Sequence, residues 1–252
     1  MDLIDVETRD GIAFVALNRP DKLNAINDDM LDRLLAAVER IGRDDAVGAA
    51  VLFGRGRAFS TGADIAAMDA MDEAAFSRTI GRFMALAAAF RACPRPIVAA
   101  VHGHALAGGF ELALVCDVRL AAAGTSFALP DTPLGLSPTS GMTYLLPRIV
   151  GLGRALHLTL SAETIDAAEA ERIGLVSRVV EADRLMDEAG SYARKLASYP
   201  RIGIEKAKAA LYAALDGDFA AATAREHASE LACFRSPEVR QRLRDFVTRK
   251  RR

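Results

Sequence analysis

The sequence predicts an α/β protein whose carboxy-terminal end is purely helical. Short apolar runs rich in β-branched residues recur between glycine-containing loops, and helical segments follow those loops. Beyond about residue 180 the apolar residues recur with helical spacing only. The 252 residues, 51% of them hydrophobic, suffice for a substantial core. We therefore expect an α/β core over residues 1–198 and a helical region over residues 199–252.

The first part of the chain predicts two strands with a helix between them. Residues 11–17 (GIAFVAL) read as a strand that NRPD ends, and residues 49–53 read as another. Asn27 or Asp28 can cap the intervening helix. Its predicted apolar face consists of Leu31, Leu34, Leu35, Val38 and Ile41.

Glycine-rich loops follow two of the predicted buried strands. GRGRAFSTGADI at 54–65 leads into a short helix near Asp64, and a longer helix spans 72–92. The second loop lies in PRPIVAAVHGHALAGGFELALVCDVRL at 94–120, where residues 97–101 predict a strand buried on both faces. Two adjacent glycines, Gly108 and Gly109, then precede the helical segment FELALV.

The Gly108–Gly109 turn has the features of an oxyanion hole. Adjacent glycines let the backbone approach a ligand, and the helix that follows presents unpaired N–H groups and partial positive charge. These groups stabilise an oxygen that becomes negative during a reaction. Glu111 places a carboxylate on the first helical turn beside this hole.

The strand and helix pattern continues to residue 180. Strands are expected at 118–122, 126–129 and 176–180, with a proline-punctuated loop after the second. A short helix is expected from Thr139 or Ser140, another at 151–160, and a third that Asp166 caps. The later helices carry apolar stripes that need a surface to cover, and we expect another subunit to supply part of it.

Composition excludes several classes of protein. The 32 basic and 33 acidic residues give a net charge of −1, which argues against a nucleic-acid partner. Three widely spaced cysteines fit a reducing compartment and show no metal-ligand spacing with the histidines, so no metal is expected. Without an 18-residue apolar run or a leader pattern, we expect a soluble cytoplasmic protein with no membrane partner.

Four motifs in order resemble the crotonase superfamily, which includes enoyl-CoA hydratases and isomerases. They are GRGRAFSTGADI, AAVHGHALAGGFELALVCDVRLA, FALPDTPLGLSPTSGMTYLLPRIVG and AERIGLVSRVV. RPDKLNAIN near the start and FRSPEVRQRLRDFVTRKR at the end fit the same pattern, so the resemblance covers nearly the whole chain.

The resemblance implies both architecture and substrate. It implies a crotonase-like spiral of ββα units with a carboxy-terminal helical region that forms trimers, commonly paired into hexamers. It also implies that the substrate is an acyl-CoA thioester, whose carbonyl oxygen accepts hydrogen bonds from the backbone N–H groups of Ala63 and Gly108. Coenzyme A is then part of the substrate, and no separate cofactor is expected.

The acidic residues indicate which reaction to expect. Hydratases of this family hold one water between two carboxylates, and the matching residues here are Glu111 and Asp131. Asp131 stands where the hydratases usually carry glutamate, so its carboxylate reaches one methylene less. We expect syn hydration of a trans-2-enoyl-CoA to a 3-hydroxyacyl-CoA, with Asp131 as the proton donor.

Two alternatives remain open at this point. A Δ3,Δ2-enoyl-CoA isomerase would use Asp131 alone to move a proton between C2 and C4, with Glu111 as a bystander. A non-catalytic RNA-binding member of the family would need neither acid. The balanced charge and the lack of basic residues interleaved with aromatic ones count against RNA binding.

Contacts with coenzyme A are expected at two places. Lys22, Leu23 and Ala25 lie in a segment that resembles the family's adenine-side loop. Phe246 and Arg249 match positions through which a neighbouring subunit's tail covers the nucleotide. Residues 66–90 and 133–145 are expected to line the acyl pocket.

Overall fold

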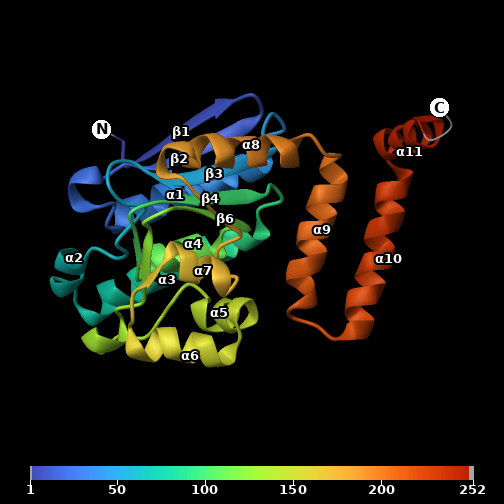
Figure 1. The fold of residues 1–252 in the computed structure, drawn as a ribbon. Coiled ribbons are helices and arrows are strands. Elements are labelled where there is room, and N and C mark those ends of the chain that lie inside the picture. The colour runs from blue at the N-terminus through green and yellow to red at the C-terminus, as the bar shows by residue number, and fades with distance from the viewer. Residues whose placement is uncertain (1, 250–252) are drawn as a thin grey trace.

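The computed structural model describes residues 2–249 and shows an α/β core from which the last helices project (Figure 1). The core contains a six-stranded sheet in the order β1-β2-β3-β4-β6-β9. β1 pairs antiparallel with β2, and every other neighbouring pair in this sheet is parallel. The strands are β1 (Ile4–Arg9), β2 (Ile12–Leu17), β3 (Ala49–Gly54), β4 (Ile97–Val101), β6 (Val118–Ala122) and β9 (Arg178–Val180).

A second, three-stranded sheet is formed by β5 (His104–Leu106), β7 (Ser126–Ala128) and β8 (Ile165–Asp166). β5 follows β4 after a turn at Gly103, where a side chain is excluded because a Cβ would lie 2.0 Å from the carbonyl oxygen of Arg57. Helix α4 (Gly108–Val115) then follows β5, and β6 and β7 repeat the same succession of strands. The expected spiral of ββα units is confirmed.

Alternate residues of the large sheet face two different helical layers. One set, which includes Val15, Leu52 and Val101, packs with α1 (Asp28–Arg43), α3 (Glu73–Ala92) and α4. The other set, which includes Phe14 and Val51, packs against α8 (Leu185–Ala197). Strands covered on both faces lose the polar alternation of half-exposed strands, as the sequence predicts. The remaining core helices are α2 (Ile65–Asp69), α5 (Met142–Val150), α6 (Leu152–Ser161) and α7 (Ala167–Arg172).

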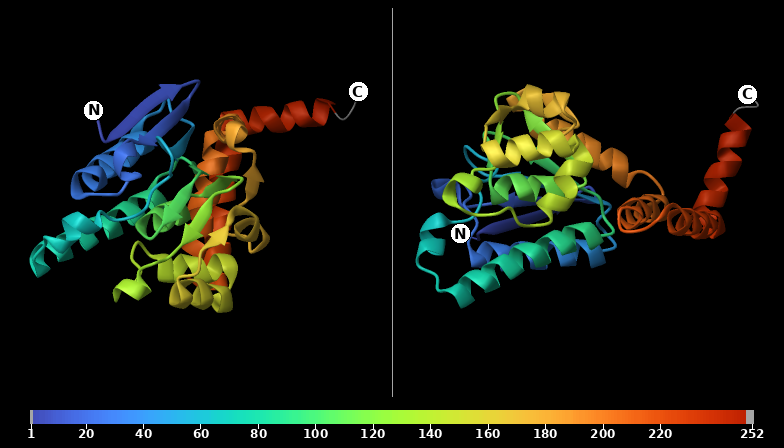
Figure 2. Two further views of the ribbon diagram at one scale, coloured as in Figure 1. Left: turned by 60° about the vertical axis from the view of Figure 1, so that its left-hand side comes forward. Right: turned by 90° about the horizontal axis from the view of Figure 1, so that it is seen from below.

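Helices α9 (Arg201–Ala214), α10 (Phe219–Arg235) and α11 (Pro237–Arg249) lie beside the core (Figures 1 and 2). Lys208 of α9 is anchored to the core, since its ammonium donates to Asp117 at 2.7 Å. The free surfaces of this region are apolar in places, with Leu211 72% and Phe219 84% exposed in the single chain. Within residues 2–249, no helix is both long and apolar enough to cross a bilayer.

Most expected elements are found, and the differences have local causes. Strand β1 was not predicted, because it is an edge strand whose sequence IDVETR is largely polar. Helix α4 begins at Gly108 itself, so the two glycines form its first turn and do not precede it. The expectation that a helix starts at Thr139 or Ser140 is wrong: α5 begins at Met142, because Ser140 has a left-handed φ of 53° and both residues turn toward α4.

Arg119 of β6 ties the end of α4 to the rest of the core. Its buried guanidinium donates to the carbonyl of Cys116 at 2.7 Å and of Leu175 at 2.7 Å. An Arg119→Met variant would leave these carbonyls buried without a donor. We expect it to lose about 3 kcal/mol of unfolding free energy, measured by urea denaturation. Loss of less than about 0.5 kcal/mol would show that water replaces the guanidinium.

Candidate active site

The two glycine loops meet beside β5. The chain at Ser60 runs parallel to β5, where the Ser60 carbonyl accepts from the Leu106 N–H at 3.0 Å. This approach is too close for side chains, because a Cβ on Gly109 would lie 2.2 Å from the Ser60 carbonyl oxygen. A Cβ on Gly62 would lie 2.7 Å from the Gly108 nitrogen. The glycines are therefore required by close backbone packing as well as by turn geometry.

The amides of Ala63 and Gly108 are neighbours on the cavity wall. A Cβ on Gly108 would lie 3.4 Å from the Ala63 nitrogen. Within the described chain, neither amide has a hydrogen-bond acceptor: Gly108 opens α4, and the bridge at Ala63 uses the groups of residues 62 and 64. Two adjacent unpaired donors on one wall have the geometry that a partly negative oxygen requires, and the oxyanion hole stays a prediction.

Ala107 sets the direction of the Gly108 amide. It is a non-glycine residue at φ 46° and ψ −124°, held there by the hydrogen bond from its N–H to the Ala128 carbonyl at 3.0 Å. Such a conformation costs about 1–3 kcal/mol and persists only where the surrounding structure imposes it. Here the hydrogen bond to β7 of the small sheet holds Ala107, and α4 begins at the cavity wall with Gly108.

Glu111 is 2% exposed, and three donors hold its carboxylate. The Thr139 N–H donates to Oε1 at 2.5 Å, and the Thr139 hydroxyl donates to Oε2 at 2.7 Å. The Ser140 hydroxyl donates to the same Oε2 at 2.9 Å. Burial raises the pKa of Glu111, while these hydrogen bonds favour the ionised form and lower it. We call these three donors of Thr139 and Ser140 the clamp. The clamp fixes the buried carboxylate in one orientation.

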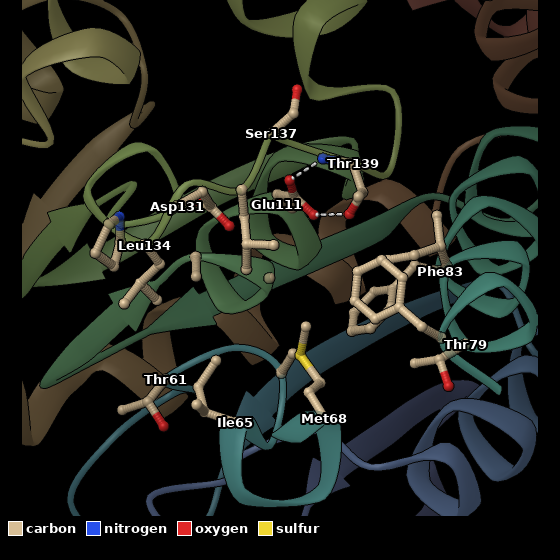
Figure 3. A pocket seen from close by; sticks show the side chains of 17 residues that line it. Thr61, Ile65, Met68, Thr79, Phe83, Glu111, Asp131, Leu134, Ser137 and Thr139 are labelled. Carbon is tan, nitrogen blue, oxygen red and sulfur yellow. Dashed lines mark hydrogen bonds between the residues drawn. The ribbon is translucent and has the colours of Figure 1, made fainter. Parts of the chain in front are cut away.

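Asp131 comes from the loop before the short 3-10 turn Thr132–Leu134. Its Oδ2 is buried and has no hydrogen-bond partner among the residues that the structure describes. Burial raises the pKa of Asp131, and its nearness to Glu111 in turn raises the pKa of Glu111. Figure 3 shows the Asp131 carboxyl directed toward Glu111 across the top of the cavity. The site thus brings a clamped carboxylate together with an unpartnered carboxyl.

The cavity below these two acids is mostly apolar (Figure 3). Ala63 and Gly108 form part of its wall together with both acids. Helix α3 supplies Phe83, whose ring lies against Gly108, where a Cβ would be 3.2 Å from Cε1. The larger apolar side chains that also line it are Ile65, Met68, Phe76, Ile80, Leu134 and Leu136. They fall within or next to the two segments expected to line an acyl pocket.

The predicted coenzyme A loop lies beside the first glycine loop. The Leu23 carbonyl accepts from the Thr61 N–H at 3.2 Å, and the Ala25 carbonyl accepts from Arg19 Nη1 at 3.0 Å. Lys22 is exposed at the end of the 3-10 turn Pro20–Lys22. The structure therefore brings this loop to the same side as Ala63.

The two predicted tail residues lie elsewhere. Phe246 lies on α11, which projects from the core (Figure 1); it is 59% exposed and does not line the cavity of its own chain. Arg249 is the last residue of α11, and its side chain lies outside the described residues. Across residues 2–249, no cluster of three or more His, Cys, Asp or Glu side chains is arranged to hold a metal ion.

Sequence reasoning missed the residues that support the site. Ser140 carried no signal beyond its place near an expected helix start, because only the fold brings its hydroxyl to Glu111. Asn24 is buried, and its side chain accepts from Arg19 N at 2.8 Å and donates to the Ala58 carbonyl at 2.8 Å. Its left-handed φ of 55° is a conformation that asparagine tolerates. That tolerance, and its place in the segment RPDKLNAIN, are the sequence signals it offered.

Loss of one donor from the clamp should be visible in the pH dependence of activity. Thr139→Val removes a hydroxyl that stabilises ionised Glu111, so the pKa of Glu111 rises and the carboxylate is protonated at a higher pH. The acidic limb of kcat/KM is then expected to move to higher pH. Thr139→Ser keeps the hydroxyl and should keep the wild-type profile. An unmoved limb in Thr139→Val would remove the hydroxyl from this role.

This chain is similar to known proteins of one family. The sequence model of the enoyl-CoA hydratase/isomerase family matches residues 7–251. The chain is 34% identical to a crotonyl-CoA hydratase of Syntrophomonas wolfei, over 98% of this chain and 96% of that protein. It is 35% identical to a short-chain-enoyl-CoA hydratase of Clostridium acetobutylicum, over 98% and 95%. An enoyl-CoA hydratase structure from Bacillus anthracis superposes with a TM-score of 0.95 at 30% identity, covering 98% of this chain and 97% of that one.

Proposed function

This chain belongs to the enoyl-CoA hydratase/isomerase family, and we propose that it is an enoyl-CoA hydratase acting on short trans-2-enoyl thioesters. The observation that carries the reaction type is the pair of carboxyl groups, Glu111 and Asp131, on one side of the cavity that holds the Ala63 and Gly108 amides. The short acyl group is supported by the names of two relatives, a crotonyl-CoA hydratase and a short-chain-enoyl-CoA hydratase.

The thioester carbonyl oxygen would accept hydrogen bonds from the backbone amides of Ala63 and Gly108. Addition of water at C3 moves the electron pair of the C2=C3 bond toward this carbonyl, and an enolate-like oxygen develops. Preorganised N–H donors stabilise that oxygen more than the ground-state carbonyl. Each such donor is commonly worth about 3 kcal/mol of transition-state stabilisation.

The two acids would divide the proton transfers. Glu111, ionised and fixed by Thr139 and Ser140, takes a proton from the water whose oxygen bonds to C3. Asp131, whose pKa burial raises, gives its proton to C2. Both groups lie on the same side of the cavity, so the hydroxyl and the proton add to the same face. Proton exchange with solvent then restores both acids, and no cofactor besides the substrate's coenzyme A is consumed.

An isomerase would need only one of the two acids. Transfer of a proton from C4 to C2 needs one carboxyl group, for which Asp131 suffices. It would not need a second acid held by three donors, and the clamp around Glu111 favours hydration for that reason. RNA binding would use neither the two acids nor the unpaired amides.

The coenzyme A moiety would lie along the loop of Lys22, Leu23 and Ala25, next to Ala63. We assign Phe246 and Arg249 to the site of a neighbouring subunit, because α11 projects away from the core of its own chain (Figure 2) and supplies no lining residue to its cavity. A trimer, or a hexamer built from two trimers, would complete the site. Arginine suits phosphate through its paired N–H donors.

The proposed activity is tested with crotonyl-CoA and a 3-enoyl-CoA measured side by side on the wild-type protein. Disappearance of the crotonyl chromophore with formation of 3-hydroxybutyryl-CoA is expected. Formation of a 2-enoyl-CoA from the 3-enoyl substrate, without hydration of crotonyl-CoA, would instead identify an isomerase. Retention of a generic RNA at physiological salt without turnover of either ester would favour the binding protein.

A further inference from the structure

The Ala63 amide is aimed by a hydrogen bond on the opposite side of its own peptide group. The Gly62 carbonyl and the Ala63 N–H belong to one planar trans peptide, so they point in opposite directions. The Gly62 carbonyl accepts from the Ile26 N–H at 2.7 Å, and the Asp64 N–H donates to the Ile26 carbonyl at 2.9 Å. The Ala63 N–H is thereby turned away from Ile26, and its direction follows the position of Ile26.

One guanidinium joins the segment that carries Ile26 to the segment that carries Ala63. Arg19 Nη1 donates to the Ala25 carbonyl at 3.0 Å and to Asp64 Oδ2 at 2.5 Å. Both acceptors are chain neighbours of the bridged residues, Ile26 and Ala63. A single nitrogen atom therefore braces both sides of the contact that aims the amide.

The Asp64 carboxylate is held at both of its oxygens. Oδ1 accepts from the Ala67 N–H at 3.3 Å at the start of α2, while Oδ2 accepts from Arg19. The side chains of Asp64 and Arg19 are only 16% and 22% exposed, so solvent screens their attraction less than it would at the surface. The hydrogen bond from Arg19 lowers the pKa of Asp64 more than burial raises it, so this carboxylate is ionised at neutral pH.

The ion pair lies outside the catalytic cavity. Neither Arg19 nor Asp64 lines the cavity, although Ala63 and Ile65 on either side of Asp64 do. The pair therefore acts on a carbonyl in the cavity through the Ala63 amide. The other donor, Gly108, has a separate support, because it opens α4 after strand β5. Loss of the pair should weaken one of the two donors and leave the other in place.

We propose that Arg19 and Asp64 are positioning residues of the oxyanion hole, and that their ion pair holds the Ala63 amide in the direction that the thioester oxygen requires. The proposal rests on the proposed acyl-CoA substrate and adds two residues outside the cavity on which the rate depends. A well-directed N–H stabilises an enolate-like oxygen more than it stabilises the ground-state carbonyl. Loss of the pair should therefore lower kcat more than it lowers the affinity for a saturated thioester.

Arg19→Met and Asp64→Asn remove the ion pair from its two ends. We expect kcat for hydration of crotonyl-CoA to fall about 10²-fold in Arg19→Met, the usual effect of a misplacement of about 1 Å. Asp64→Asn keeps an oxygen for the Ala67 N–H and should lose less. It also leaves the bond from Arg19 to the Ala25 carbonyl, so its affinity for butyryl-CoA should stay near the wild-type value.

The carbonyl stretch of bound butyryl-CoA reports on the amide without turnover. A hydrogen bond to a carbonyl oxygen weakens the C=O bond and lowers its vibrational frequency. Infrared difference spectra with an isotope-labelled carbonyl should therefore show this band at higher wavenumber in both variants than in the wild type. A merely structural role would lower the melting temperature without moving the band. Arg19→Lys keeps a cation that can donate to Asp64, and should restore part of the band shift and of kcat.

Arg55→Met is the matched control. Arg55 lies at the other end of the same glycine loop, and its guanidinium pairs with Asp5 of β1. This variant should keep both the wild-type kcat and the wild-type band.

The double variant Arg19→Met/Asp64→Asn should lose no more kcat than Arg19→Met alone, because both substitutions act through one contact. An unmoved band in folded Arg19→Met and Asp64→Asn would overturn the proposal. So would the same band shift in Arg55→Met, or losses of kcat that multiply in the double variant. Failure of the wild type to bind butyryl-CoA would instead overturn the acyl-CoA assignment itself.

Discussion

The Glu111→Gln variant is expected to lose hydration of crotonyl-CoA by a factor of about 10²–10⁴ in kcat, the usual contribution of a positioned acid or base. Glutamine has nearly the same shape but cannot take a proton from water. Its amide can still meet the clamp, because one oxygen accepts from the Thr139 N–H and the hydroxyls of Thr139 and Ser140 can rotate to accept. The loss should therefore be in kcat, with little change in the affinity for butyryl-CoA.

The measurement is steady-state hydration of crotonyl-CoA together with thermal melting. Glu39→Gln makes the same chemical change at an exposed position of α1 and should leave both quantities at wild-type values. Hydration within tenfold of wild type in a folded Glu111→Gln protein would exclude Glu111 as the base. Isomerisation of a 3-enoyl-CoA that survives Glu111→Gln would show that proton transfer at C2 does not depend on this residue.

The regular fold was predictable because its signals are local. Strand β4 at Ile97–Val101 is a β-branched apolar run bounded by prolines and a glycine, and these properties need no tertiary information. The caps Asn27 and Asp166 were predictable for the same reason, and the structure has both, with Met30 N and Glu169 N as donors. Strand β1 escaped prediction because its edge position leaves it polar.

The candidate site was predictable only in its motif residues. Glu111 follows a glycine turn that the local sequence marks, whereas Asp131 was assigned by resemblance to a family. The Thr139–Ser140 clamp depends on a loop that reaches back to α4 across 28 residues, and no local pattern encodes that contact.

Asp131→Asn is expected to reduce hydration by about the same factor of 10²–10⁴, because asparagine has no carboxyl proton to give to C2. Unlike Glu111→Gln, it should also abolish isomerisation of a 3-enoyl-CoA, which needs this acid in either mechanism. Asp131→Glu keeps the acid and should retain measurable hydration. Full hydration activity in Asp131→Asn would remove Asp131 from the chemistry and leave Glu111 as the single acid.

Asp131→Asn is expected to lower activity but to maintain or raise the stability of the fold. Burial raises the pKa of Asp131 in the folded protein, so the folded state binds this proton more tightly than the unfolded state. The free energy of unfolding therefore falls as the pH rises from the pKa that Asp131 has in the unfolded chain to the higher pKa that it has in the folded protein. This loss of stability persists at neutral pH. Asp131→Asn removes that penalty, so its melting temperature at pH 7 should equal or exceed the wild-type value, and the difference should shrink in acid. A variant that is inactive yet no less stable would show that the unpartnered Oδ2 is kept for proton transfer at a cost to the fold.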